Sequence, residues 1–145
     1  MWQILQQENG LVKIHAKGVA AHASTPEMGK NAVCALLDFV SRLPIAQGRK
    51  QAAVAAAAKL FPMADYNGAA LGVNLKDEIS GTLSMNLGIV DLENDALKGV
   101  FDSRIPLCGT DENVTEVIRK KMAEHGLTLE EGRMIEGHHV PADSP

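Results

Sequence analysis

A loop of small residues around a single histidine separates a strand pattern from a helix pattern, and it constrains the fold more than any other stretch. Before the loop, Val12, Ile14 and Ala16 alternate with polar residues, which indicates a half-buried strand. After it, apolar residues recur at helical spacing until Pro44. We therefore place His22 at the centre of any site, although a lone histidine at such a junction is more often structural than catalytic.

Two helix starts are compatible with this stretch. The segment Ser24-Thr25-Pro26-Glu27 has the form of a capping box, with Pro26 well placed in a first helical turn. The alternative start lies after Gly29. The sequence leaves both starts open.

The next part of the chain predicts a second helix and then an irregular segment. Residues 47–60 are rich in alanine, which packs closely but buries little area, so we expect this helix at the periphery or against a neighbour. From Asp65 to about Gly81, glycine and asparagine interrupt any periodicity.

Two strands joined by a hairpin connection at 91–95 follow. Residues 82–89 alternate, and Asn86 lies on the face opposite the apolar side chains. The next strand, which ends at Pro106, places Arg104 on that same outer face. The apolar residues expected on the inner face are Leu83, Met85, Leu87, Ile89, Leu97, Phe101 and Ile105.

A last helix and a last strand complete the pattern. Thr110 or Asp111 caps the helix, whose apolar stripe runs from Val114 to Met122, and Gly126 ends it. Residues 127–135 predict a final strand, and the polar, proline-bounded residues 138–145 predict a linker.

This order predicts the α+β class, with a ferredoxin-like β-α-β-β-α-β domain over residues 1–137. It consists of a four-stranded antiparallel sheet with two helices on one face and an alanine-rich helical insertion at about 45–80. The other face of the sheet is open, so we expect it to meet another domain, a partner strand or a substrate.

Composition excludes several functional classes. The net charge of -4 and the aromatic content of 3% argue against nucleic-acid binding. No apolar run approaches the roughly 18 residues of a membrane span, and the first seven residues are too polar for a secretory signal. Cys34 and Cys108 form no metal motif and no disulfide framework, so we expect a cytoplasmic protein.

The polar side chains that indicate a site are His22, Asn86 and Arg104. A histidine can donate a hydrogen bond to a developing oxyanion, an arginine can hold a carboxylate with two hydrogen bonds, and an asparagine adds an amide donor. The ordinary alternative is that Arg104 is a surface cation paired with Asp102, and that Asn86 is a polar residue on a strand face.

The sequence lacks the rest of a hydrolase site. It contains no H-E-x-x-H or G-x-S-x-G motif, and Ser24 is too close to His22 along the chain to be assumed a nucleophile. The adjacent pair His138-His139 would point to opposite faces of a strand, and no carboxylate stands at metal-ligand spacing from a histidine. The sequence therefore predicts an incomplete site, which has candidate hydrogen-bond donors but lacks a nucleophile and metal ligands.

The segment 18–32 resembles the signature G-x-x-A-H-[AS]-x-x-P-x-x-G-x-N-A. This signature belongs to the lid, or dimerisation, domains of the zinc aminoacylase/carboxypeptidase G2 family of peptidases. Residues 81–88 and 101–106 are similar to the later lid strands, and Gly109-Thr110-Asp111 resembles the PepV-like, carnosinase-type bacterial dipeptidases.

The resemblance implies that the chain is an excised lid and that the catalytic domain is missing from it. Residues 138–145 would then be the linker that leads back to the catalytic domain. His22 then corresponds to the lid histidine that stabilises the oxyanion at a dinuclear zinc site, and Arg104 to the arginine that binds the dipeptide carboxylate. Asn86 is a further substrate-binding candidate. The fragment alone is expected to hold no metal, because the two zinc ions belong to the catalytic domain.

The expected partners are the catalytic domain of the same parent chain and a dipeptide, with a second copy of the chain as an open alternative. No nucleic acid or membrane is expected. The alternative hypothesis is a non-enzymatic ferredoxin-like module that dimerises or binds a small ligand through its open face. The substrate specificity, the native metal and the natural chain boundaries stay open.

Overall fold

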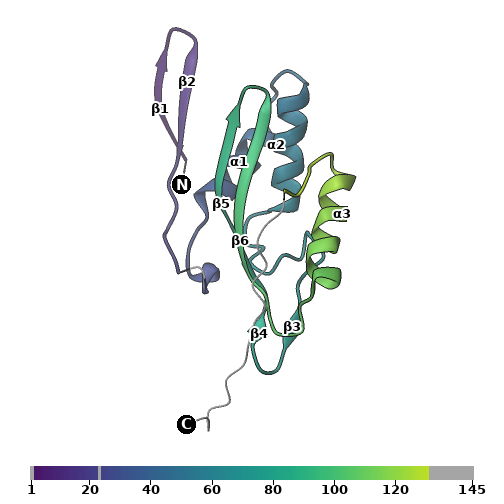
Figure 1. Ribbon diagram of the computed structural model, residues 1–145. Coiled ribbons are helices and arrows are strands. Elements are labelled where there is room, and N and C mark those ends of the chain that lie inside the picture. The colour runs from purple at the N-terminus through teal and green to yellow at the C-terminus, as the bar shows by residue number, and fades with distance from the viewer. Residues whose placement is uncertain (1, 23, 131–145) are drawn as a thin grey trace.

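The computed structural model of the protein describes residues 2–22 and 24–130, with side chains from residue 9 onward (Figure 1). None of the described helices has the length and apolar character that a membrane crossing requires. The elements in chain order are β1 (Trp2–Glu8), β2 (Leu11–Ala16), the 3-10 helix η1 (Pro26–Met28), α1 (Ala32–Ser41), α2 (Arg49–Leu60), β3 (Lys76–Asp77), β4 (Gly81–Thr82), β5 (Ser84–Glu93), β6 (Ala96–Arg104), the π-helix η2 (Asp111–Thr115) and α3 (Glu116–Glu124).

The α+β class is confirmed, but the expected four-stranded sheet is not found among the described residues. The strands instead form three antiparallel pairs, β1–β2, β3–β4 and β5–β6. Figure 1 shows the β1–β2 hairpin standing apart from the β5–β6 hairpin. One edge of β2 is taken by β1, and residues 127–130, where the last strand was expected to begin, have no strand structure. The rest of that strand and the predicted linker lie outside the described residues.

β1 is absent from the sequence-based prediction, yet its turn carries a clear signal. Asn9 and Gly10 join β1 to β2 with φ angles of 51° and 78°. Two consecutive left-handed residues match the twist of a two-residue hairpin, and Asn-Gly is a preferred pair for this turn.

The β5–β6 hairpin confirms the predicted connection but corrects one face assignment. Asn94 and Asp95 form the turn, with φ angles of 46° and 64°. The ladder register shifts between Leu87 and Ile89. This bulge inverts the alternation, so that Leu87 is buried while Ile89 is 61% exposed.

The three α-helices pack against one face of the β5–β6 hairpin, whereas two helices on one face of a four-stranded sheet were expected (Figure 1). Of the two predicted positions for the alanine-rich helix, packing against a neighbour is confirmed and the periphery is not, because α2 contributes to the core and its Ala57 is only 3% exposed. The small side chains let α2 approach its neighbours closely. The core consists of Cys34, Leu37, Val54, Ala57, Leu60, Phe61, Leu71, Val73, Leu83, Met85, Leu87, Val114 and Ile118.

The later of the two predicted helix starts is confirmed for α1. Asn31 is its N-cap, and residues 26–28 form only a 3-10 turn, to which the Thr25 side chain adds no capping hydrogen bond. Of the two predicted caps of the last helical segment, Thr110 and Asp111, the structure shows Thr110, which forms a capping box with Asn113.

Candidate functional site

The loop that carries His22 is closed at its base by two backbone hydrogen bonds. The Val19 amide donates to the Lys30 carbonyl at 3.0 Å, and the Lys30 amide donates to the Val19 carbonyl at 2.9 Å. The flanking glycines allow this approach, because a Cβ on Gly18 would overlap the Lys30 carbonyl oxygen and one on Gly29 would lie 2.6 Å from the Val19 carbonyl oxygen. The spacing of the two glycines therefore fixes the base of the loop.

Replacing Gly29 with alanine is expected to lower the free energy of unfolding by about 1–3 kcal/mol, because the added Cβ meets backbone that is already hydrogen bonded. Chemical denaturation followed by circular dichroism measures this loss. Gly48→Ala is the matched control, since a Cβ there meets nothing within 4 Å, and we expect it to lose less than about 1 kcal/mol. Equal losses in the two variants would contradict the role of the close contact.

His22 is exposed on this loop, and Ser24 fixes its tautomer. The Ser24 backbone amide donates to His22 Nδ1 at 3.2 Å, and the Ser24 hydroxyl lies 2.7 Å from the same nitrogen. An N–H group can only donate, so Nδ1 is the acceptor and the neutral ring carries its proton on Nε2. His22 therefore presents an N–H donor away from Ser24.

Asn86 is held at the start of α1 by Asn31. The Asn31 side-chain oxygen accepts hydrogen bonds from the backbone amides of Val33 at 2.8 Å and Cys34 at 3.0 Å. Its Nδ2 donates to Asn86 Oδ1 and to the Leu87 carbonyl, both at 2.8 Å. These bonds join the end of the His22 loop to β5.

Arg104 lies on the outer face of the β5–β6 hairpin, as predicted. It is exposed and pairs across the ladder with Ser84, while Asp102 pairs with Asn86. The ion pairs found among the described residues do not include the expected alternative, Arg104 with Asp102. Arg104 therefore shares a sheet face with Asn86 without a carboxylate partner in that part of the chain.

A pocket of about 330 Å³ brings His22 and Asn86 together, and Arg104 does not line it. Its ionisable lining residues among those described are His22 and Lys30, so no carboxylate faces it there. Such a lining favours a ligand with oxygen acceptors. The lining consists of Gly18, Val19, Ala20, Ala21, His22, Pro26, Gly29, Lys30, Asn31, Ala32, Val33, Asn86, Leu87 and Gly88.

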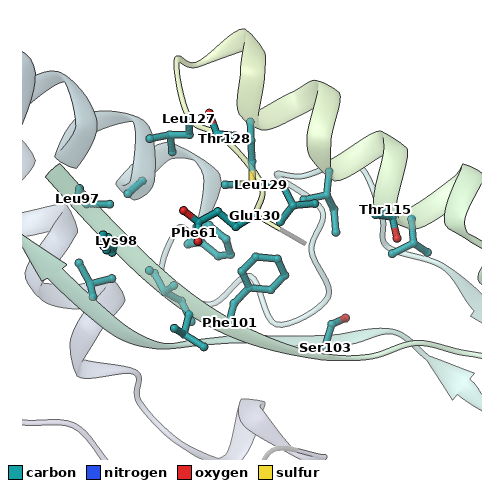
Figure 2. Close-up of a pocket in the computed structure, with 18 of the residues that line it drawn as sticks. Phe61, Leu97, Lys98, Phe101, Ser103, Thr115, Leu127, Thr128, Leu129 and Glu130 are labelled. Atoms are coloured by element: carbon teal, nitrogen blue, oxygen red, sulfur yellow. The ribbon is translucent and has the colours of Figure 1, made fainter. Parts of the chain in front are cut away.

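A larger pocket of about 530 Å³ lies between β6, α2, α3 and residues 127–130 (Figure 2). Its lining is mainly apolar, and the rings of Phe61 and Phe101 pack within it with centroids 5.4 Å apart. None of the three predicted site residues lines it. The pocket is thus an apolar hollow beside β6 and away from the predicted site.

The described residues do not fit a zinc site. Within residues 2–22 and 24–130, no three His, Cys, Asp or Glu side chains lie together as metal ligands would. Asp65 accepts hydrogen bonds from three backbone amides, and Asp77 accepts from Ile79, Ser80 and Cys108. The bonds from Ser80 hold the pKa of Asp77 well below its ordinary value. His138 and His139 lie outside the described residues.

Neither cysteine forms a disulfide in the described part of the chain. Cys34 is buried in α1, and this burial raises the pKa of its thiol to about 11, whereas Cys108 is exposed. The buried thiol is therefore protonated and unreactive at neutral pH.

Two residues that contact the predicted site are absent from the sequence-based site. Ser24 bonds His22, and Asn31 bonds Asn86. Both belong to the stretch 18–32, and Asn31 stands two residues after Gly29, where the later helix start lies and where asparagine is a preferred N-cap. Its second contact joins positions 55 residues apart, which no local pattern shows.

Comparisons with known proteins agree with the resemblance seen in the sequence. A family model described as a peptidase dimerisation domain matches residues 9–127. Proteins named "putative dipeptidase" are similar to 95% of this chain, at 25% identity in Staphylococcus aureus strain USA300 and at 26% in Staphylococcus epidermidis and Staphylococcus haemolyticus. The chain spans 29% of the length of these relatives.

Proposed function

The chain belongs to the peptidase dimerisation domain family, and on this premise we propose that it is the lid of a dipeptidase. The lid would supply side chains to an active site that a separate catalytic domain of the parent protein holds. The names of the relatives support the substrate class. The observation that carries the proposal is the shared pocket of His22 and Asn86, in which two potential hydrogen-bond donors meet and no carboxylate is found among the described lining residues.

His22 acts in this proposal as a donor to the reacting carbonyl oxygen. Its Nδ1 is occupied by Ser24, and its Nε2–H group has no hydrogen-bond partner among the described residues, so this group can donate to a substrate. A hydrogen bond from Nε2 strengthens as negative charge develops on that oxygen, which stabilises the transition state more than the substrate. The two zinc ions that the resemblance implies are assigned to the catalytic domain, because the described residues here do not form their site.

Arg104 binds the carboxylate of the dipeptide in this proposal. Its exposed guanidinium has no carboxylate partner among the described residues, and its planar donors match a carboxylate with two hydrogen bonds. Asn86 adds an amide donor on the same face of the hairpin. Closure of the lid on the catalytic domain would bring these groups to one substrate.

Replacing Arg104 with alanine in the full-length parent protein is expected to raise KM for a dipeptide about 10- to 100-fold, because a charge-assisted hydrogen bond is lost. The same variant is expected to change KM little for the corresponding dipeptide amide, which has no carboxylate. Steady-state kinetics with both substrates measures the difference.

Lys98→Ala is the matched control for this experiment, since Lys98 is an exposed cation on the same strand. An equal rise in KM for the dipeptide and its amide would exclude Arg104 as the carboxylate-binding residue. A parent protein that hydrolyses no dipeptide when loaded with zinc would overturn the lid proposal itself.

A second candidate function is homodimerisation, which the family description supports. Ile89 and Val100 lie directly opposite each other in the β5–β6 ladder, and 61% and 57% of their surface is exposed. Exposed apolar pairs of this kind favour a partner surface. The mass of the chain in solution, measured by light scattering, decides between a monomer and a dimer.

A further inference from the structure

Backbone groups fix the orientation of the Asn31 side chain. The amides of Val33 and Cys34 both point at one terminal atom of this side chain, at 2.8 and 3.0 Å. Backbone amides only donate, so this atom is the oxygen, and the other terminal atom is Nδ2. The assignment therefore does not depend on any choice between the two orientations of the amide.

Asn31 in turn fixes the orientation of the Asn86 side chain. Asn31 Nδ2 donates to the Leu87 carbonyl at 2.8 Å, and it also lies 2.8 Å from one terminal atom of Asn86. Because Nδ2 carries only donors, the Asn86 atom that faces it is Oδ1. The Asn86 Nδ2 group must then point elsewhere. It lies 3.8 Å from the position of a Cβ built on Gly88, another residue of the pocket lining.

We propose that Asn31 is a positioning residue that makes Asn86 a hydrogen-bond donor toward the pocket it shares with His22. The pocket then selects a ligand oxygen at this point, such as a carbonyl or carboxylate oxygen of a peptide. Among the described residues, no hydrogen bond occupies Asn86 Nδ2, whereas Oδ1 is taken by Asn31. The functional part of this inference rests on the proposed lid function, and the orientation of Asn86 does not.

Asn31 makes three kinds of contact, and one substitution keeps only the first. Its oxygen caps α1, and its Nδ2 orients Asn86 and donates to the Leu87 carbonyl. Aspartate caps a helix about as well as asparagine but has no donor. In Asn31→Asp, the Asn86 amide is therefore expected to rotate, so that its Nδ2 donates to the new carboxylate and its Oδ1 faces the pocket.

The kinetic test uses the full-length parent protein. Asn31→Asp is expected to lower kcat/KM for a dipeptide about 10- to 100-fold, because an acceptor now faces a substrate oxygen. The melting temperature is expected to fall moderately, because the carboxylate also leaves the Leu87 carbonyl without its donor. In the Asn86→Ala background, Asn31→Asp is expected to have little further effect, since it acts through Asn86. Additive losses would overturn the positioning role.

A second measurement concerns the 145-residue chain and needs no activity. In nuclear magnetic resonance spectra, the Asn31 side-chain NH2 protons are expected to exchange slowly with water, because both are hydrogen bonded, and those of Asn86 quickly. Asn31→Asp is expected to slow the exchange at Asn86. Slow exchange at Asn86 in the wild type would overturn the orientation, whatever the parent protein catalyses. If the orientation holds but the parent protein hydrolyses no dipeptide, only the proposed function fails.

Discussion

Replacing His22 with alanine in the full-length parent protein is expected to lower kcat by about 100-fold or more, because loss of one oxyanion donor has an effect of this size. KM is expected to change little, since the hydrogen bond from Nε2 forms fully only as charge develops on the substrate oxygen. Steady-state kinetics with a dipeptide, under conditions of full metal loading, measures both constants.

The control for this variant is His15→Ala, because His15 is an exposed histidine on the neighbouring strand β2 and lines neither pocket. His22→Gln is a second comparison, since glutamine keeps a side-chain N–H donor and should retain part of the rate. A near-wild-type kcat in His22→Ala would refute the oxyanion role, while an equal loss in His15→Ala would point to a general structural effect.

The strand, loop and helix around His22 could be predicted from the sequence because their signals are local. The choice between two helix starts could not, because it depends on a contact across the loop. The antiparallel bridge between Val19 and Lys30 ends the loop directly before Asn31. The Asn31 side chain then accepts hydrogen bonds from the first unpaired backbone amides of α1, those of Val33 and Cys34. Thr25 has the right residue type for a cap but makes no capping hydrogen bond.

The sheet was harder to predict than its strands. Alternation identifies β2, β5 and β6, but it says nothing about which strand edges meet, and the described strands form separate pairs. Strand alternation also fails to predict the β-bulge at Gly88. This bulge reverses the alternation, so that Ile89 does not lie on the inner face where the sequence places it. Asn9-Gly10, in contrast, is a local hairpin signal that predicts the missing strand β1 once it is given its usual weight.

The candidate site could be predicted in part. The sequence places Asn86 and Arg104 on one strand face, which the ladder confirms. It does not predict that the pocket joins Asn86 to His22 while Arg104 lies outside its lining, because that depends on how the loop folds over β5. The proposed role for Arg104 at the same substrate therefore depends on the proposed closure of the lid, and the pocket does not supply it.

Replacing Leu71 with alanine is expected to lower the free energy of unfolding by about 2–5 kcal/mol, which is the range for a buried leucine. The segment between α2 and β3 has no periodic pattern, yet Leu71 is 0% exposed and belongs to the core of the chain. Its burial arises from the turns around Gly68 and Gly72, whose φ angles are 70° and 79°.

Urea denaturation of the 145-residue chain measures this loss, and Leu92→Ala is its matched control. Leu92 is 41% exposed on β5, so its truncation removes less buried area and leaves no enclosed cavity. We expect the Leu92 variant to lose less than about 1 kcal/mol. A loss at Leu71 no larger than at Leu92 would mean that this irregular segment does not stabilise the fold, and the core would then rest on the helices and the β5–β6 hairpin alone.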